Sequence, residues 1–545
     1  MGRYPAAILL AAILALILIG DSAGLMDPVE PPFLGKATLC ARVIRITEND
    51  ASGKTVILEA DSVDSRAVVP FRLRGIYLSS LPELYPGRRV WLTSRIDSLT
   101  PDPDVPDVFP ATGRLRRRGV SSSVTFIADS IHAVAPGGGL TAACRRLNRR
   151  IVHQMDELPL TVSANEMLSA MLLGNGEIIA HEKRNTYSAA GLSHIMALSG
   201  MHVGIIAMII GFMLWPFYLG RHVRLKLMLT ILALWAYVAL TGLAPSAVRA
   251  AIMTTVYMTG RILQRRSEAL NSLCLAAFLI LLFRPADLWA EGFQMSFAAV
   301  LGIILFYPKI NRVDRRRHPR LYALVSYPAL SVSAMLFTSL LAAWHFHTFP
   351  LYFLAANLLA APVIPLFIGS GIVALAIGWV APANLLAAVL DWIAGLFAGL
   401  PEAQISALYP PLWLVLGLFA AMIVLGLARR KWLRLQAGLW ICVMLAMVLV
   451  LPAPRVRGEQ YYIQEPRFTH LLQTYPEGAC TLFTTAHHYY DVQAMEARAE
   501  VMFRDFAARR RIAPPPVVSV DSIIRRTGSS GSSEGGFPDD CRPAK

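Results

Sequence analysis

The sequence predicts a polytopic α-helical membrane protein with about eleven spans and a small extracytoplasmic β-barrel near its N-terminus. Three observations support this fold class. The 545 residues are 55% hydrophobic and 16% charged, whereas soluble domains carry about a quarter charged residues. The apolar residues gather in runs of about 15 to 25 residues, the length that crosses a hydrocarbon core. Residues 35–135 instead show short alternating stretches typical of β-strands.

Residues 1–24 form the first predicted element. Arg3 precedes an apolar core from Ala6 to Ile19, which suits either a transmembrane anchor or the apolar region of a signal peptide. The following GDSAGL is a poor cleavage site, so we favour an uncleaved anchor.

Residues 35–135 follow as a β domain. Turn signals such as ASGK and YPGR separate its β-branched stretches. The predicted strands cover 37–47, 54–60, 67–75, 88–96 and 120–128. Five short strands suit a small barrel of the OB type, while the proline-rich stretch 101–110 is typical of a rigid loop.

Residues 139–190 are predicted to be an amphipathic helical connector, with RRLNRR (145–150) as a surface cluster. The membrane domain, 191–452, comes next. Its ten predicted spans lie near 198–219, 225–242, 246–263, 268–284, 290–307, 322–344, 351–379, 383–400, 411–428 and 435–452. The segment 351–379 is long enough to be broken or re-entrant. Residues 453–545 are predicted to be a soluble tail with a disordered Gly/Ser-rich end.

The net charge of +15 is mostly a topology signal and not a nucleic-acid surface. Basic residues gather in alternate loops, at 221–226, 261–266, 309–320 and 429–434, whereas 241–247, 347–350 and 401–411 have none. Because cytoplasmic loops hold the positive excess, these basic loops face inward. This places the N-terminus in the cytoplasm, with the β domain and the C-terminal tail outside it.

The cysteine pattern predicts no structural zinc site, since no CxxC occurs. Two disulfides are conceivable if the soluble segments lie outside the cytoplasm: Cys40 with Cys144, and Cys480 with Cys541. Cys274 and Cys442 lie in apolar runs as packing residues.

GLSHIMALSGMHVG (191–204) places polar residues where a membrane helix begins. Gly200 and Gly204 form a GxxxG, which permits close helix packing. His194, Ser199 and His202 would share a polar face if the helix were continuous, which suggests a water-lined cavity. The residues alone leave tight packing and a polar pathway equally open.

A second segment, TGLAPSAVRAAIM (241–253), contains Ser246 and Arg249 at the start of a span. An arginine in a span is expensive, so it either contacts a polar pathway or extends to the membrane interface.

Two further segments carry polar residues into spans. In 285–303, Glu291, Gln294 and Ser296 could line the pathway, and Glu291 or Gln294 could pair with Arg249. Asn357 and Pro362 mark a predicted helix interruption. His345 and His347 are typical of an interface and not of a metal site.

These four segments resemble the ComEC family of bacterial DNA-uptake proteins. The family signatures stand here as GLSHIMALSGMHVG, TGLAPSAVRAAIM, GFQMSFAAVLGI and NLLAAP, in this order, between about residues 165 and 370. The resemblance implies an inner-membrane channel that passes single-stranded DNA into the cytoplasm, with an OB-like domain outside. The metallo-β-lactamase-like nuclease domain of many members has the motif HxHxDH, which this sequence lacks. We therefore expect the form without the nuclease, no enzyme activity, no metal and no cofactor.

The resemblance also suggests partners and contacts. No nucleotide-binding P-loop is present, so a separate cytoplasmic ATP-driven motor and a separate DNA receptor or nuclease are expected. The sequence also leaves open whether the protein forms a homo-oligomer. An OB domain binds single strands with a basic groove and aromatic stacking, for which six side chains are available: Arg72, Arg74, Tyr77, Arg88, Arg89 and Trp91. The alternative functions are transport of another anionic polymer or solute, and a membrane scaffold that transports nothing.

Overall fold

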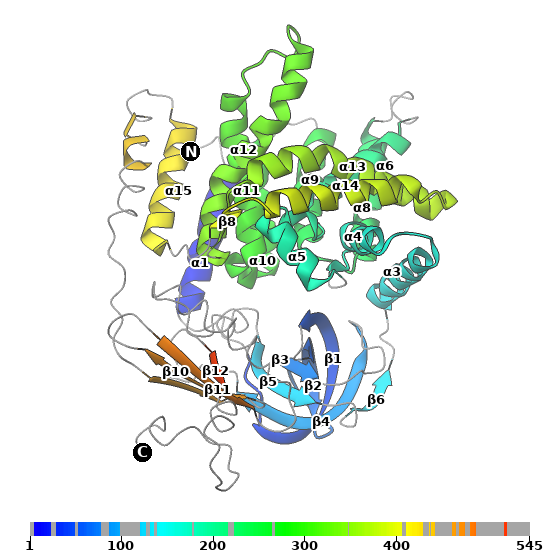
Figure 1. The fold of residues 1–545 in the computed structure, drawn as a ribbon, viewed down its shortest axis with the longest axis vertical. Coiled ribbons are helices and arrows are strands. Elements are labelled where there is room, and N and C mark those ends of the chain that lie inside the picture. Colours follow the sequence, from blue (N-terminus) through cyan, green and yellow to red (C-terminus); the bar gives the residue numbers. More distant parts are fainter. Residues whose placement is uncertain are drawn as a thin grey trace. The chain divides into compact units, whose positions relative to one another are not determined.

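The structure is a computed structural model (Figure 1). It describes residues 5–22, 29–49, 53–77, 87–98, 120–126, 131–135, 139–176, 179–215, 223–263, 268–346, 348–405, 410–428, 435–436, 438–441, 460–464, 468–474, 480–486 and 517–519. The chain divides into two units. The first contains Met1–Asp27 and Pro136–Leu445, and the second contains Pro28–Ala135 and Ala446–Lys545.

The second unit contains the predicted β domain. Its strands are β1 (Gly35–Asn49), β2 (Gly53–Val63), β3 (Arg66–Tyr77), β4 (Arg89–Ser98), β5 (Val120–Phe126) and β6 (Ile131–Ala135). The pairings β1–β2, β2–β3, β3–β5, β5–β4 and β4–β1 close five strands into a ring, in which only β3–β5 is parallel. The sequence predicted these five strands. It did not predict β6, which adds to β4 and is only five residues long.

Alternation along the strands builds the core of this sheet. Leu39, Leu58, Leu73 and Leu92 are at most 1% exposed, and the residues between them point to the other face. The sheet is therefore apolar on its inner face and charged on its outer face.

A second sheet lies in the C-terminal region, where the sequence predicted only a tail of mixed character. Its strands are β9 (Gln460–Gln464), β10 (Phe468–Thr474), β11 (Cys480–Ala486) and β12 (Val517–Ser519), in the order β12-β11-β10-β9. These stretches lack strict polar–apolar alternation, which is why they were not predicted. The predicted disordered end lies outside the described residues.

The first unit is helical. Its longer helices are α1 (Pro5–Ser22), α3 (Gly139–Glu157), α8 (Val223–Leu240), α9 (Pro245–Ile262), α11 (Glu291–Ile310), α12 (Pro319–Phe346), α13 (Phe353–Ile377) and α14 (Ala381–Ala398). The shorter ones are α4 (Val162–Leu173), α5 (His181–Ala189), α6 (Gly200–Met213), α10 (Ala269–Phe283) and α15 (Leu412–Leu427), with 3-10 turns η3 (Ser193–Ile195) and η4 (Pro285–Trp289). Two short strands, β7 (Phe349–Pro350) and β8 (Gln404–Ile405), pair between them.

Five of the described helices are long and apolar enough to cross a membrane: α8, α11, α12, α13 and α14. Five shorter ones are apolar: α1, α4, α6, α10 and α15. Nine of the ten intervals predicted after residue 191 contain a described helix, because an apolar run of this length is a strong signal. The tenth, 435–452, lies mostly outside the described residues. The total of eleven spans stays a prediction.

The predicted interruption of α13 at Asn357 and Pro362 is wrong. α13 continues from Phe353 to Ile377 with Pro362 and Pro365 inside it. Each proline removes one helical hydrogen bond, but packed neighbours can tolerate that loss in a membrane helix. One face of α13 is buried against α4, α12 and α14, which holds the helix together through the prolines.

The main hydrophobic core joins α4, α5, α6, α13 and α14. Leu168, Tyr187, Ile364 and Phe367 are at most 1% exposed in this core. The core fixes the relative positions of the connector helices and the α13–α14 pair, which carry residues of the site described next.

Candidate functional site

Gly191–Gly204 is a turn followed by a helix entrance. Gly191 has φ +77°, and a Cβ there would lie 2.9 Å from atoms of Phe353 and Pro350. Both the positive φ and the close approach require glycine. η3 follows, and α6 begins at Gly200. The predicted entrance is confirmed, but His194 and His202 do not share a continuous helix face.

His202 caps the start of α6. The Ser199 backbone N–H donates to Nδ1 of His202 at 3.0 Å, and Ser199 Oγ lies 3.2 Å from the same nitrogen. The ring thus does what Glu or Gln does at the third position of a capping box. Because Nδ1 accepts this hydrogen bond, the neutral ring carries its proton on Nε2. His202 is 0% exposed, and among the described residues its Nε2 has no hydrogen-bond partner.

His194 lies in η3 and is exposed, unlike His202. Its ring contacts Phe353 edge-on, with centroids 5.9 Å apart, and interacts with the Asn357 side chain and the Gly191 backbone. The first motif therefore contacts α13 through both Gly191 and His194.

Of the two glycines of the GxxxG in α6, only Gly200 lies against another described helix. A Cβ at Gly204 would meet no atom within 4 Å, and one at Gly200 would meet only Ala250 Cβ, at 3.7 Å. Both glycines are exposed, as are Ala197 and Met201. Of the two alternatives left open by the sequence, tight packing is wrong at Gly204.

The second motif packs directly on the first. Ser246 Oγ donates to the Leu198 carbonyl, and Ala250 faces Gly200. Arg249 is only 7% exposed, so its side chain is buried within the protein. Within the described chain, its Nε has no hydrogen-bond partner.

Arg249 reaches the third motif at the start of α11. Its Nη2 lies 2.8 Å from the point that a Cβ of residue 292 would occupy, so Gly292 makes room for the guanidinium. Asp287 in η4 and Arg284, which precedes η4, interact electrostatically with the guanidinium. The Arg249 guanidinium therefore lies against the N-terminal end of α11.

Other polar residues of the third motif have their own partners. Gln294 Nε2 donates to the Leu288 carbonyl at 2.9 Å, and Gln294 Oε1 lies 2.8 Å from His345 Nε2. The suggested Gln294–Arg249 pair is therefore wrong. Glu291 and Ser296 are half-buried. No described group of three His, Cys, Asp or Glu residues could hold a metal, and His347 lies outside the described residues.

Asn357, in the fourth motif, is buried. Its Nδ2 donates to Ser331 Oγ at 3.2 Å, and its side chain interacts with His194. The structure thus links all four motifs: the first contacts the second and the fourth, and Arg249 joins the second to the third.

Comparison with known proteins shows which family the region with the four motifs resembles. A family model described as "Competence protein" matches residues 171–432, which include all four motifs. Residues 171–432 are similar to competence proteins. The expected family resemblance is confirmed.

Two relatives share part of this competence domain. The chain is 30% identical to ComE operon protein 3 of Bacillus subtilis (strain 168) over 228 residues, 42% of this chain and 28% of that protein. It is 27% identical to the uncharacterized protein YcaI of Escherichia coli (strain K12) over 207 residues, 37% of this chain and 27% of that protein. The matched region thus spans less than a third of either relative. No solved structure matches the chain.

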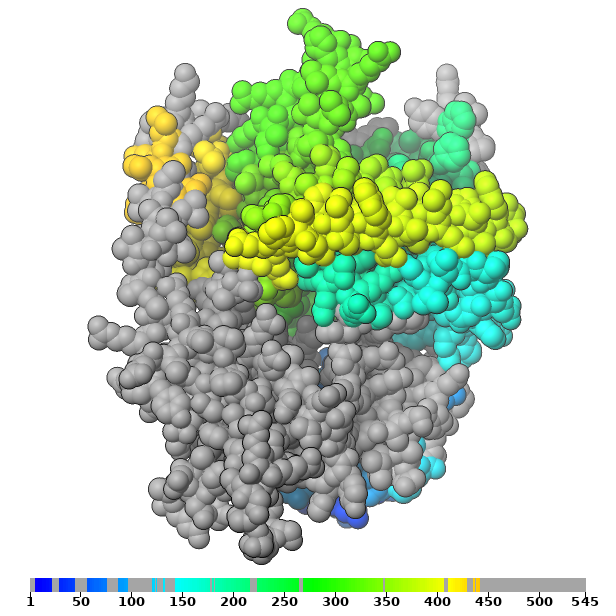
Figure 2. All heavy atoms as spheres, viewed as in Figure 1, coloured from blue at the N-terminus to red at the C-terminus, as the bar shows by residue number. Residues whose placement is uncertain are grey.

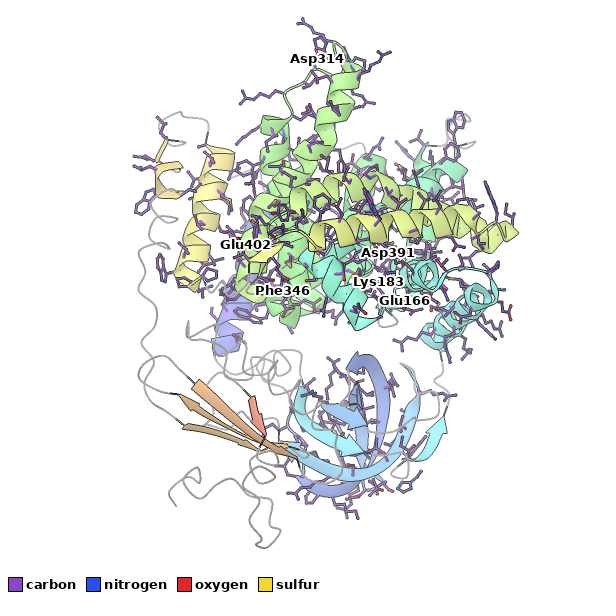
Figure 3. All side chains as sticks on the ribbon, in the orientation of Figure 1. Glu166, Lys183, Asp314, Phe346, Asp391 and Glu402 are labelled. Carbon is purple, nitrogen blue, oxygen red and sulfur yellow. The ribbon has the colours of Figure 1, made fainter. Side chains whose placement is uncertain are left out.

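The helical unit also contains a polar cluster that the sequence did not reveal (Figure 3). Asp391 of α14 accepts from Tyr187 Oη at 2.8 Å, lies 3.2 Å from Lys183 Nζ and accepts from Ser163 Oγ. Lys183 Nζ also donates to Ser163 Oγ. Burial, and secondly Asp391, raise the pKa of the Tyr187 phenol, which keeps it a hydrogen-bond donor. The available signal was that Asp391 is the only ionisable residue of α14.

The candidate DNA contacts of the β domain are partly engaged in ion pairs. Arg72 Nε lies 3.3 Å from Glu59, and Arg89 Nη2 lies 2.8 Å from Asp61. Trp91 sits between the inward-facing Val90 and Leu92 and is half-buried on the outer face.

The other three candidate DNA contacts of this sheet are Arg74, Arg88 and Tyr77. Arg74, also on the outer face, stands opposite Ile57, and Arg88 precedes β4. The side chain of Tyr77 lies outside the described residues. The outer face therefore presents Arg72 and Arg74 on β3, and Arg89 and the half-buried Trp91 on β4.

The cysteines that the structure describes are free. Cys40 and Cys144, suggested as one disulfide, are both free thiols, as is Cys274. Burial, and secondly Asp61, raise the pKa of the Cys40 thiol. The side chain of Cys480 and the whole of Cys541 lie outside the described residues.

Proposed function

We propose that this protein is a channel that passes single-stranded DNA into the cytoplasm during natural transformation. The observation that carries the proposal is the chain of contacts that links the four ComEC-type motifs within the region that matches competence proteins. The partners would be single-stranded DNA, a separate cytoplasmic ATP-driven motor, and a separate receptor or nuclease. The chain itself would need no cofactor and carry out no catalysis.

The chemistry of this meeting point supports a polyanion as the cargo. Burying a guanidinium without a hydrogen-bond partner on Nε is costly, so Arg249 needs a compensating role. A phosphate that passes the N-terminal end of α11 would meet both the guanidinium and backbone N–H groups. The exposed His194, Ala197 and Met201 lie on the same motif and would border the path.

The strand ring of the second unit supports an OB-type barrel. A ring of five strands matches the strand number of the OB-fold, which binds oligonucleotides. Arg74 and Trp91 on its outer face would contact phosphate and base, respectively. Arg72 and Arg89 would have to break their ion pairs with Glu59 and Asp61 before they bind phosphate. Their contribution to DNA affinity would therefore be smaller than that of Arg74.

The basic loops set the proposed orientation in the inner membrane. With the positive loops on the cytoplasmic side, the β domain and the C-terminal segment would lie outside. An incoming strand would then meet the β domain before the competence domain.

A deletion strain tests this function. Fluorescently labelled DNA should stay outside the cytoplasm in the deletion strain and enter after complementation with the wild-type gene. Complementation with Arg249→Ala at equal membrane abundance should restore little uptake. Unchanged DNA uptake in the deletion strain, with no second copy of the gene, would falsify the proposal. Loss of uptake of another anionic polymer or solute, with DNA uptake intact, would favour the alternative cargo.

A further inference from the structure

Helix α3 is anchored to the ends of α4 and α8 by the buried side-chain amide of Asn148, in addition to the core contacts of Met155. Asn148 Nδ2 donates at 3.0 Å to both the Leu173 and the Leu240 carbonyls, the last residues of α4 and α8. C-terminal carbonyls of a helix lack helical partners, so Asn148 satisfies two helix ends at once. Asn175 in turn donates to Asn148 Oδ1 at 3.0 Å. α3 is therefore held firmly across the ends of α4 and α8.

The opposite face of α3 is basic. At 3.6 residues per turn, Arg145, Arg146, Arg149, Arg150 and His153 occupy about 140° of the helix circumference. Arg146, Arg150 and His153 are exposed, and Met155 on the other face is 0% exposed. Figure 2 shows the cyan stretch that includes α3 on the surface of the helical unit.

This basic face costs stability. Arg145 and Arg149, and likewise Arg146 and Arg150, are like charges four residues apart, an arrangement that destabilises a helix. No acidic residue stands three or four positions from any of the four arginines. Among the described residues, no ion pair forms at Arg146 or Arg150. Of the two acidic residues of α3, Asp156 is the nearer to these arginines in sequence, and it accepts a hydrogen bond from Asn165 Nδ2 at 2.7 Å. A ligand that neutralises the face would offset this repulsion.

Membrane topology does not account for these arginines. α3 caps the C-terminal end of α8, next to the uncharged loop 241–247, and the Arg145 side chain approaches Gly242 there. The basic segment 221–226 includes the opposite, N-terminal end of α8. The positive-inside rule therefore assigns the C-terminal end of α8, which contacts α3, to the outside of the membrane. The rule predicts no excess of arginine on that side.

We propose that the arginine face of α3 binds the phosphate backbone of the incoming DNA strand at the outer entrance of the competence domain. The inference rests on the proposed function. The chain runs from β6 into α3 through residues 136–138, so α3 is the first described helix after the β domain and precedes the competence domain along the chain. Arginine suits this task because its planar guanidinium matches phosphate with paired hydrogen bonds. The exposed pair Arg146 and Arg150 supplies the principal contacts.

The test uses the full-length protein in nanodiscs of zwitterionic lipid and a fluorescent 20-nucleotide oligo-dT strand. Arg146→Glu should weaken binding at least tenfold and reduce the salt slope of log affinity by about 0.7, the loss of one single-strand phosphate contact. The same change turns the repulsion between positions 146 and 150 into an attraction, with the acid on the N-terminal side of Arg150, which is the favourable order. The thermal midpoint should therefore stay equal or rise, whereas loss of a merely structural arginine would lower it. Arg146→Lys should retain most of the binding.

Arg316→Glu, in the basic loop 309–320, is the matched control and should leave strand affinity unchanged. Equal affinities of Arg146→Glu and wild type would overturn the inference, as would an equal loss in the control. A second series in nanodiscs with anionic lipid tests a lipid headgroup as the ligand. If Arg146→Glu removes a stabilisation by anionic lipid and leaves strand binding intact, the face binds lipid and the inference fails. Wild-type protein that neither binds the strand nor supports uptake would instead refute the proposed function.

Discussion

At the scale of single residues, the two histidines of the first motif have different roles. His202 is a helix cap in the core, whereas His194 is exposed beside Asn357. A cap residue contributes about 1 kcal/mol, and removing a buried ring adds a cavity cost.

We therefore predict that His202→Ala lowers the thermal midpoint, and that His202→Gln recovers much of the loss because a glutamine oxygen can accept the same N–H. Thermal unfolding in detergent measures both. DNA uptake that falls equally in both variants, at unchanged stability, would show that His202 acts through acid–base chemistry and not as a cap.

A second prediction at this scale concerns the Cys40 thiol. Burial and the Asp61 carboxylate both favour the neutral thiol and raise its pKa, so the reactive thiolate is scarce near neutral pH. Cys40 should react with iodoacetamide more slowly than Cys144, and its rate should rise only at higher pH. Asp61→Asn should shift the pH–rate curve of Cys40 to lower pH. A curve that does not move would mean that Asp61 has no influence on the thiol.

At the scale of elements, the Lys183–Asp391 pair holds α5 and α14 together. The two side chains are 15% and 34% exposed, so part of the interaction is screened by solvent. Asp391→Asn leaves the Lys183 ammonium without its counter-charge and should cost about 1–2 kcal/mol, a value reduced for this exposure.

The double variant Lys183→Met/Asp391→Leu should cost less than the sum of the single changes, because neither charge is left alone. A double-mutant cycle by thermal unfolding measures this. Strictly additive costs would mean that the pair is not coupled, in which case the core alone holds α5 against α14.

How much the sequence could predict also differs between elements. The helices and the five ring strands were predictable because each follows from a local pattern, an apolar run or an alternation. The continuity of α13 through Pro362 was not, because packing against α4, α12 and α14 overrides the local effect of proline. The Lys183–Asp391 pair joins residues 208 positions apart, and no local pattern encodes such a contact.

At the scale of the whole molecule, the order of the motifs along the chain did predict the family but not their arrangement. The contacts Ser246–Leu198, Arg249–Gly292 and His194–Asn357 bring segments from four parts of the chain together. They surround a helix entrance whose exposed residues include Ala197 and Met201. The central claim is that the DNA strand passes beside this entrance.

Photo-crosslinking during uptake tests this claim most directly. A benzophenone side chain at position 197 should form an adduct with radiolabelled DNA when competent cells are irradiated during uptake. The same group at Trp392, an exposed residue of α14 outside the four motifs, should form none. Cells that import DNA normally with the probe at position 197 and yield no adduct there, or an equal adduct at position 392, would contradict the account.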